Sequence, residues 1–211
     1  MSEQTNSNTV MLVHGMFSWP LFMHKLNHSL RSEGYRTCAF SYSPRRGKLQ
    51  QLREDFAQFA VSQSQPLHFV AHSLGGLLAL DFLSNHEMPQ SRLISLNCPL
   101  LKSRTVEYLN QSLWGRALMG NSFELFDGLR PARITNVDAG LICGDKAIGL
   151  SRLLGHLQSP NDGAVELREC FVADYPQKIV LPVSHAGSLL SSRVCNETVY
   201  FLKHGRFTSG Q

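Results

Sequence analysis

Short apolar runs alternate along the chain with longer amphipathic segments. The runs that predict strands cover residues 10–13, 37–42, 67–71, 92–96, 140–143 and 178–183. Segments with apolar residues three and four positions apart predict helices over residues 21–31, 49–61, 77–83 and about 194–202. Alternation at this spacing predicts an α/β fold with a mostly parallel central sheet and helices on both faces. Continuous apolar strands such as residues 10–13 are typical of strands buried on two sides.

The stretch of residues 100–137 has the least regular pattern. It holds large apolar residues that include Leu109, Trp114 and Phe126. These residues are compatible with one or two core helices, or with a small cap that forms one wall of an apolar substrate pocket. The predicted organisation is therefore a flexible N-terminus over residues 1–9 and a single domain over residues 10–207, with a possible small cap at about 100–137.

Composition narrows the class of protein. Hydrophobic residues make up 43% of the 211 residues and charged residues 17%, which excludes a mostly unfolded chain. The net charge of +4 is spread without a run of five like charges, so no nucleic-acid partner is expected. The first nine residues lack the pattern of a secretory signal, and no apolar stretch approaches the ~20 residues that span a bilayer. We expect a cytoplasmic protein without stable membrane insertion, whose five cysteines are separate thiols.

The strongest local signal surrounds Ser73. An apolar strand over residues 67–71 leads into this serine, and two glycines and an apolar helix follow it. A serine on such a sharp turn exposes its hydroxyl above the edge of the sheet, provided that the residues two before and two after it are small. Ala71 and Gly75 meet this requirement, although the usual pattern G-x-S-x-G has glycine where Ala71 stands. The alternative is a serine that caps a helix after an ordinary strand.

The sequence resembles the α/β-hydrolase family, and within it the small lipase and esterase branch. The resemblance runs from about residue 10 to residue 207 and rests on four segments in the expected order. They are residues 12–16 (LVHGM), 71–75 (AHSLG), 161–165 (NDGAV) and 184–185 (SH). The resemblance implies the chain order serine, acid, histidine for the catalytic groups, with Ser73 as the nucleophile and no metal or organic cofactor.

The resemblance also places the groups that bind a developing oxyanion. By position these are the backbone N–H groups of Met16 and Leu74, and Gly15 lets the backbone approach the substrate. Two histidines border this region. We expect His14 to contact loop backbone and the side chain of His72 to point away from the Ser73 hydroxyl. Phe17, Trp19 and Pro20 follow directly, as core residues or as a wall of the acyl pocket.

A catalytic base is expected on a loop at the carboxyl end of a strand, which is the position of His185 after the strand at 178–183. Two aspartates compete for the role of its acid. Asp162 lies in a polar turn typical of the acid in lipases of the family, whereas Asp145 follows the strand at 140–143. Likeness to the motif favours Asp162. His24 and His28 lie four residues apart, but two histidines alone do not predict a metal site.

These residues predict a serine hydrolase that cleaves carboxylic esters of a small molecule or a lipid through an acyl-enzyme intermediate. A thioesterase or acyltransferase with the same triad is an alternative, as is a non-catalytic interaction protein that kept the fold. Residues 14–18 (HGMFS) do not form a glycine-rich phosphate loop, which argues against a nucleotide-binding protein. The oligomeric state stays open.

Overall fold

A computed structural model describes residues 8–129, 137–149, 155–171 and 177–208 of the protein. Six strands form one sheet in the order β2-β1-β3-β4-β5-β6, and every neighbouring pair is parallel. They are β1 (Thr9–Val13), β2 (Arg36–Phe40), β3 (Leu67–His72), β4 (Arg92–Leu96), β5 (Asp138–Gly144) and β6 (Gln177–Leu181). The predicted parallel sheet is confirmed. The prediction of a flexible terminus over residues 1–9 is wrong at Thr9, because β1 begins there. Residues 1–7 lie outside the described part.

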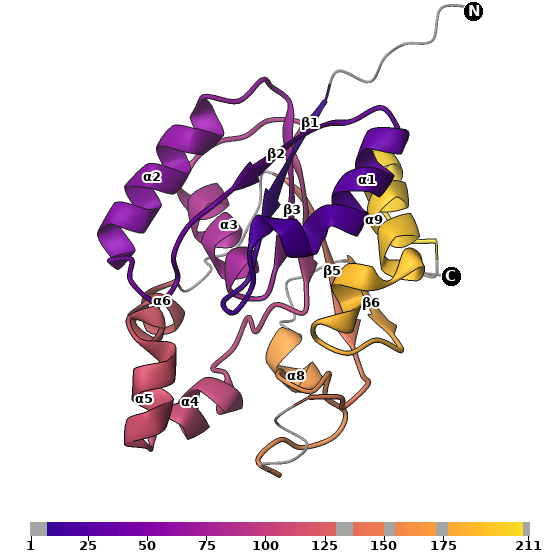
Figure 1. The fold of residues 1–211 in the computed structure, drawn as a ribbon. Helices are drawn as coiled ribbons and strands as arrows, with labels where there is room; N and C mark the ends of the chain where they lie inside the picture. Colours follow the sequence, from indigo (N-terminus) through magenta and orange to yellow (C-terminus); the bar gives the residue numbers. More distant parts are fainter. Residues whose placement is uncertain (1–7, 130–136, 150–154, 172–176, 209–211) are drawn as a thin grey trace, which may run out of the picture.

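Helices cover both faces of the sheet, as predicted (Figure 1). α1 (His24–Ser32) and α9 (Ser192–His204) pack on one face, whereas α2 (Leu49–Val61) and α3 (Leu74–Asn85) pack on the other. Two layers of buried apolar side chains separate the helices from the sheet. Burial of this apolar surface is the main favourable contribution to folding.

The order of the strands places a crevice beside β1 and β3. From β1 the chain crosses to β2 through α1, and it then returns through α2 to β3 on the other side of β1. The two connections therefore lie on opposite faces of the sheet, with a topological switch point between β1 and β3. Ligands of open α/β sheets bind at such a switch point.

Three short helices follow β4 and lie below α2 in Figure 1. We call the segment that holds α4 (Arg104–Asn110), α5 (Leu113–Met119) and α6 (Ser122–Gly128) the insertion. The serine hydroxyls at 103 and 112 accept hydrogen bonds from the first turns of α4 and α5, which explains where these helices begin. The sequence suggested one or two helices here, and residues 130–136 of that stretch lie outside the described part.

The remaining elements are small. A 3₁₀ helix, η1 (Pro20–Met23), precedes α1 and divides the helix that was predicted over residues 21–31, with proline in its first turn. α8 (Leu167–Cys170) precedes β6, and a second 3₁₀ helix, η2 (Gly187–Leu190), precedes α9. Within the four described ranges, no helix is long and apolar enough to cross a membrane.

Candidate active site

Ser73 occupies the sharp turn between β3 and α3. Its backbone has φ 53° and ψ −122°, a strained conformation for a residue with a side chain. Gly75 packs so closely on the end of β1 that a Cβ atom there would lie 2.5 Å from the carbonyl oxygen of His14. Ala71 is fully buried in β3. The turn therefore depends on a small residue at position 75.

This contact leads to a prediction for stability. We expect Gly75→Ala to lower the free energy of unfolding by about 2–4 kcal/mol, because the added methyl group meets backbone that has no room to move. Denaturant unfolding followed by circular dichroism measures the change. Gly47→Ala is the matched control in an exposed loop, and we expect it to change stability by less than about 1 kcal/mol. Equal effects of the two substitutions would contradict the steric argument.

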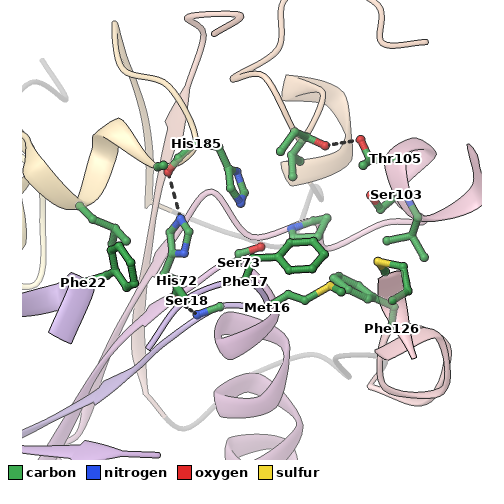
Figure 2. A pocket seen from close by; sticks show the side chains of 18 of the residues that line it. Met16, Phe17, Ser18, Phe22, His72, Ser73, Ser103, Thr105, Phe126 and His185 are labelled. Atoms are coloured by element: carbon green, nitrogen blue, oxygen red, sulfur yellow. Dashed lines mark hydrogen bonds between the residues drawn. The ribbon is translucent and has the colours of Figure 1, made fainter. Parts of the chain in front are cut away.

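His185 and Asp162 meet at the carboxyl edge of the sheet. His185 Nδ1 lies 2.7 Å from Asp162 Oδ2. Because a carboxylate only accepts hydrogen bonds, Nδ1 carries the hydrogen and Nε2 keeps a free lone pair. His185 and Ser73 line the same pocket (Figure 2), although in the described chain no hydrogen bond yet joins the imidazole to the hydroxyl. Such contacts often tighten only when substrate binds.

The backbone of His185 is held from several sides. Its N–H donates to the carbonyl oxygen of Asp162 at 2.8 Å. Its own carbonyl oxygen accepts from His72 Nε2 at 3.0 Å, Asn97 Nδ2 at 3.1 Å and Ser188 Oγ at 2.8 Å. Burial, followed by the neighbouring His185, lowers the pKa of His72 to about 3, so this ring stays neutral with its hydrogen on Nε2. His72 thus lines the pocket and supports the backbone of the histidine loop.

Asn97 is a site residue that the sequence analysis missed. It follows β4 directly, has φ 50° and is fully buried. Its Oδ1 accepts from the N–H of Gly144 at 2.8 Å, and its Nδ2 also donates to Ser188 Oγ at 2.9 Å. The side chain therefore connects β4, β5 and the histidine loop. An asparagine at the carboxyl end of a predicted strand was the available signal, since asparagine tolerates positive φ.

The side chain of Asp162 is buried, and both of its carboxylate oxygens accept hydrogen bonds. Its Oδ1 accepts from the N–H groups of Ala164 at 2.9 Å and Val165 at 2.7 Å, which leaves Oδ2 for His185. Asp145, the alternative acid, is exposed and lines a separate hollow beside Lys146. The structure brings Asp162, and not Asp145, to the imidazole.

The first helix of the insertion holds the turn that carries Asp162. Thr105 Oγ1 in α4 donates to the carbonyl oxygen of Ala164 at 2.5 Å and lies 3.0 Å from His156 Nε2. His156 in turn stacks on Tyr108, with ring centroids 4.5 Å apart. Nothing in the sequence pattern pointed to Thr105, because its partners lie more than 50 positions away.

The loop after β1 lies against Ser73. A Cβ atom on Gly15 would lie 2.9 Å from His72 Nδ1 and 3.0 Å from Ser73 Cβ, so this loop and the serine turn are in contact. Met16 follows at the pocket wall, and Leu74 begins α3, where helical N–H groups have no partner within the helix. Met16 and Ser73 thus line the same pocket, and Leu74 follows Ser73 directly.

His14 supports the same loop. Its Nδ1 donates to the carbonyl oxygen of Gly15 at 2.8 Å, and its ring stacks on Tyr42 with centroids 4.5 Å apart. Tyr42 also donates its hydroxyl hydrogen to the carbonyl oxygen of His14 at 2.9 Å. Burial lowers the pKa of His14, which favours the neutral ring in this position.

A pocket of about 360 Å³ opens beside Ser73 and His185 (Figure 2). Most of its walls are apolar, and the insertion supplies Val106, Leu109, Met119 and Phe126. Phe17 also lines the pocket, whereas Trp19 does not and is largely exposed. The few polar groups converge at the end where the serine and the histidine lie, which is the usual arrangement of a small-molecule site.

Metal ligands do not gather in the described residues. Within residues 8–129, 137–149, 155–171 and 177–208, no cluster of three His, Cys, Asp or Glu side chains could hold a metal ion. All five cysteines are free thiols, and four of them are buried.

A family model for the alpha/beta hydrolase family matches residues 10–190. The chain belongs to the alpha/beta hydrolase family. No curated protein matches this hydrolase at the level of sequence.

Solved structures share the hydrolase fold at low identity. An esterase of Pyrococcus furiosus, PF2001, is 18% identical with a TM-score of 0.60, over 94% of this chain and 83% of that one. The carboxylesterase CesB of Bacillus subtilis is 16% identical with a TM-score of 0.58, over 95% and 85%. A structure reported for the metagenome-derived lipolytic enzymes LipS and LipT is 13% identical with a TM-score of 0.60, over 93% of both chains. At these identities the comparisons establish the fold alone.

Proposed function

We propose that this hydrolase cleaves carboxylic esters by transferring the acyl group to Ser73 and then to water. The observation that carries the proposal is that Ser73, in a strained backbone conformation, lines the same pocket as His185, whose Nδ1 donates a hydrogen bond to the buried Asp162. This arrangement activates a hydroxyl group for attack on an acyl carbon.

In the proposed reaction, His185 Nε2 takes the proton of the Ser73 hydroxyl as Oγ attacks the carbonyl carbon. Asp162 keeps Nδ1 protonated and stabilises the imidazolium that forms. The amides of Met16 and Leu74 donate to the developing oxyanion. The imidazolium then protonates the leaving alcohol as the ester bond breaks, and His185 activates a water that releases the acid.

Apolar acyl chains suit the pocket. The side chains of Val106, Leu109, Met119 and Phe126 form one wall, and the volume of about 360 Å³ lies within the range of sites for small organic ligands. The esterase and lipolytic neighbours agree with this substrate class. A thioesterase or acyltransferase would use the same three residues, so the identity of the leaving group and of the acceptor has to be measured.

A panel of p-nitrophenyl esters of graded acyl length tests the proposal, with the Ser73→Ala protein as the blank. We expect kcat/KM to rise with chain length until the chain exceeds the pocket and then to fall. Acyl thioesters of the same lengths, assayed in parallel, separate an esterase from a thioesterase. No turnover of either series above the blank would contradict the proposed hydrolase activity.

The insertion leads to a prediction for specificity. Met119 is buried at the pocket wall, so Met119→Phe adds a bulky ring to the space for the acyl chain. We expect kcat/KM for the longest accepted ester to fall by about tenfold relative to the acetate ester. Leu118→Phe is the control, because Leu118 adjoins Met119 but does not line the pocket. Equal changes for all chain lengths would show that Met119 does not bound the acyl chain.

A further inference from the structure

Large apolar side chains stand exposed around the mouth of the pocket. Phe17, Phe22 and Leu190 line the pocket and are 60%, 56% and 57% exposed, respectively. Trp19 and Leu21 belong to the same loop and η1 segment and are 73% and 79% exposed. We call these five residues the apolar rim. Since η1 and η2 are in contact, the rim is continuous from the loop after β1 to Leu190.

An exposed group of this kind has an energetic cost, because water contacts apolar surface that folding could bury. Scattered exposed apolar residues are ordinary, whereas a contiguous group beside a pocket marks a site of contact with another surface. Phe17 and Phe22 line the same pocket as Ser73 (Figure 2), so a surface that contacts the rim also covers the entrance to the pocket.

Cations accompany the rim, and carboxylates are missing from the segments that form it. Arg45 and Arg46 line a second hollow together with Phe17 and Trp19. Lys25 Nζ donates a hydrogen bond to the carbonyl oxygen of Leu190, a rim residue, at 2.8 Å. Residues 14–32, 36–53 and 183–196 contain no aspartate or glutamate. The apolar rim is therefore flanked by cations, whereas the carboxylates Glu107, Glu124 and Asp127 belong to the insertion that forms another wall of the pocket.

We propose that the apolar rim docks the protein reversibly on an anionic lipid surface. The aromatic and aliphatic side chains would enter the interface, where tryptophan is favoured, while Lys25, Arg45 and Arg46 lie near the anionic headgroups. A second copy of the chain fits this face less well, because a symmetric dimer would bring the same cations together. Given the proposed ester hydrolysis, on which this last step rests, docking would let an acyl lipid enter the pocket directly from the surface.

Co-sedimentation of the full Ser73→Ala protein with vesicles tests the docking without hydrolysis of the lipid. We expect binding to phosphatidylglycerol-rich vesicles that weakens with added salt, and weaker binding to pure phosphatidylcholine. The further substitutions Trp19→Ser and Leu21→Ser together are expected to lower the affinity for the anionic vesicles by at least about tenfold. Val61→Ser is the matched control, because Val61 is also exposed but lies at the end of α2 that leads to the amino end of β3.

Two arginine substitutions test the contribution of positive charge to vesicle binding separately from that of apolar contact. We expect Arg46→Gln to weaken binding to the anionic vesicles about fivefold, since each cation near such a surface contributes about this factor. Arg36→Gln removes an exposed arginine at the amino end of β2 and is expected to leave binding unchanged. Equal effects of the two arginine substitutions would overturn the assigned orientation.

Three further results would overturn the docking proposal. They are no sedimentation with anionic vesicles, no loss of binding in the Trp19→Ser, Leu21→Ser protein, and a dimer in solution that this double substitution dissociates. The ester assay is independent of these outcomes. The double substitution in the protein with Ser73 present should leave turnover of soluble p-nitrophenyl acetate unchanged, and vesicle binding without any turnover would contradict the hydrolase proposal alone.

Discussion

Replacing Ser73 by alanine is expected to lower kcat for p-nitrophenyl esters by about 10⁴-fold or more while the protein stays folded. The hydroxyl is the proposed nucleophile, and the methyl group of alanine has no atom that could attack the ester. The turn itself depends on backbone contacts, including the hydrogen bond from the Ser73 N–H to the carbonyl oxygen of Leu96 at 2.8 Å, which alanine retains. Steady-state kinetics and thermal unfolding measure the two effects.

A fluorophosphonate probe gives a second readout for the same residue. We expect the probe to label the native protein and to fail with Ser73→Ala, because labelling requires an activated serine. Ser43→Ala is the matched control, since Ser43 is exposed in a loop outside the pocket. Labelling or turnover that persists at the native level in Ser73→Ala would remove this serine from the proposed role.

Asp162→Asn is expected to lower kcat by about 10⁴-fold, whereas Asp145→Asn should leave it unchanged. An asparagine at position 162 can donate to His185 Nδ1, which favours the hydrogen on Nε2 and removes the lone pair that accepts the proton of Ser73. Asp145 is exposed and lines another hollow, so its carboxylate does not contact the imidazole of His185. Kinetics on one p-nitrophenyl ester compare the two variants directly.

The aspartate comparison has an internal control for folding. Asp162 Oδ1 also accepts two backbone N–H groups, and the side-chain oxygen of asparagine can accept the same bonds. Circular dichroism and thermal unfolding should therefore show a folded Asp162→Asn protein. A loss of activity in Asp145→Asn that equals the loss in Asp162→Asn would contradict the assignment of the acid.

The sheet could be predicted because its signal is local. Residues 10–13 form a continuous apolar run within β1, and residues 92–96, which include the apolar Leu93, Ile94 and Leu96, coincide with β4. The insertion was harder, because its buried residues, such as Leu109 and Met119, are spread over helices of only seven residues each. Such short helices give too few turns for a clear periodic pattern.

Parts of the candidate site could be predicted, and others depend on contacts between distant segments. The pairing of His185 with Asp162 followed from the family motif, and the structure has the expected contact. Asn97 and Thr105 act through partners on other segments, which no local pattern displays. Trp19 was expected in the core or in the acyl pocket, but it is exposed, since a short apolar sequence does not reveal which side of a loop faces water.

The hydrogen bond from Thr105 to the carbonyl oxygen of Ala164 has a consequence for engineering. The insertion that forms one wall of the pocket also holds the turn of the Asp162 carboxylate, so exchanging the whole insertion for a segment from another protein of the family would alter the pocket and this turn together. A graft designed to change chain-length preference should keep a hydroxyl side chain at position 105, and libraries that randomise this position would recover inactive members whose pockets are well formed.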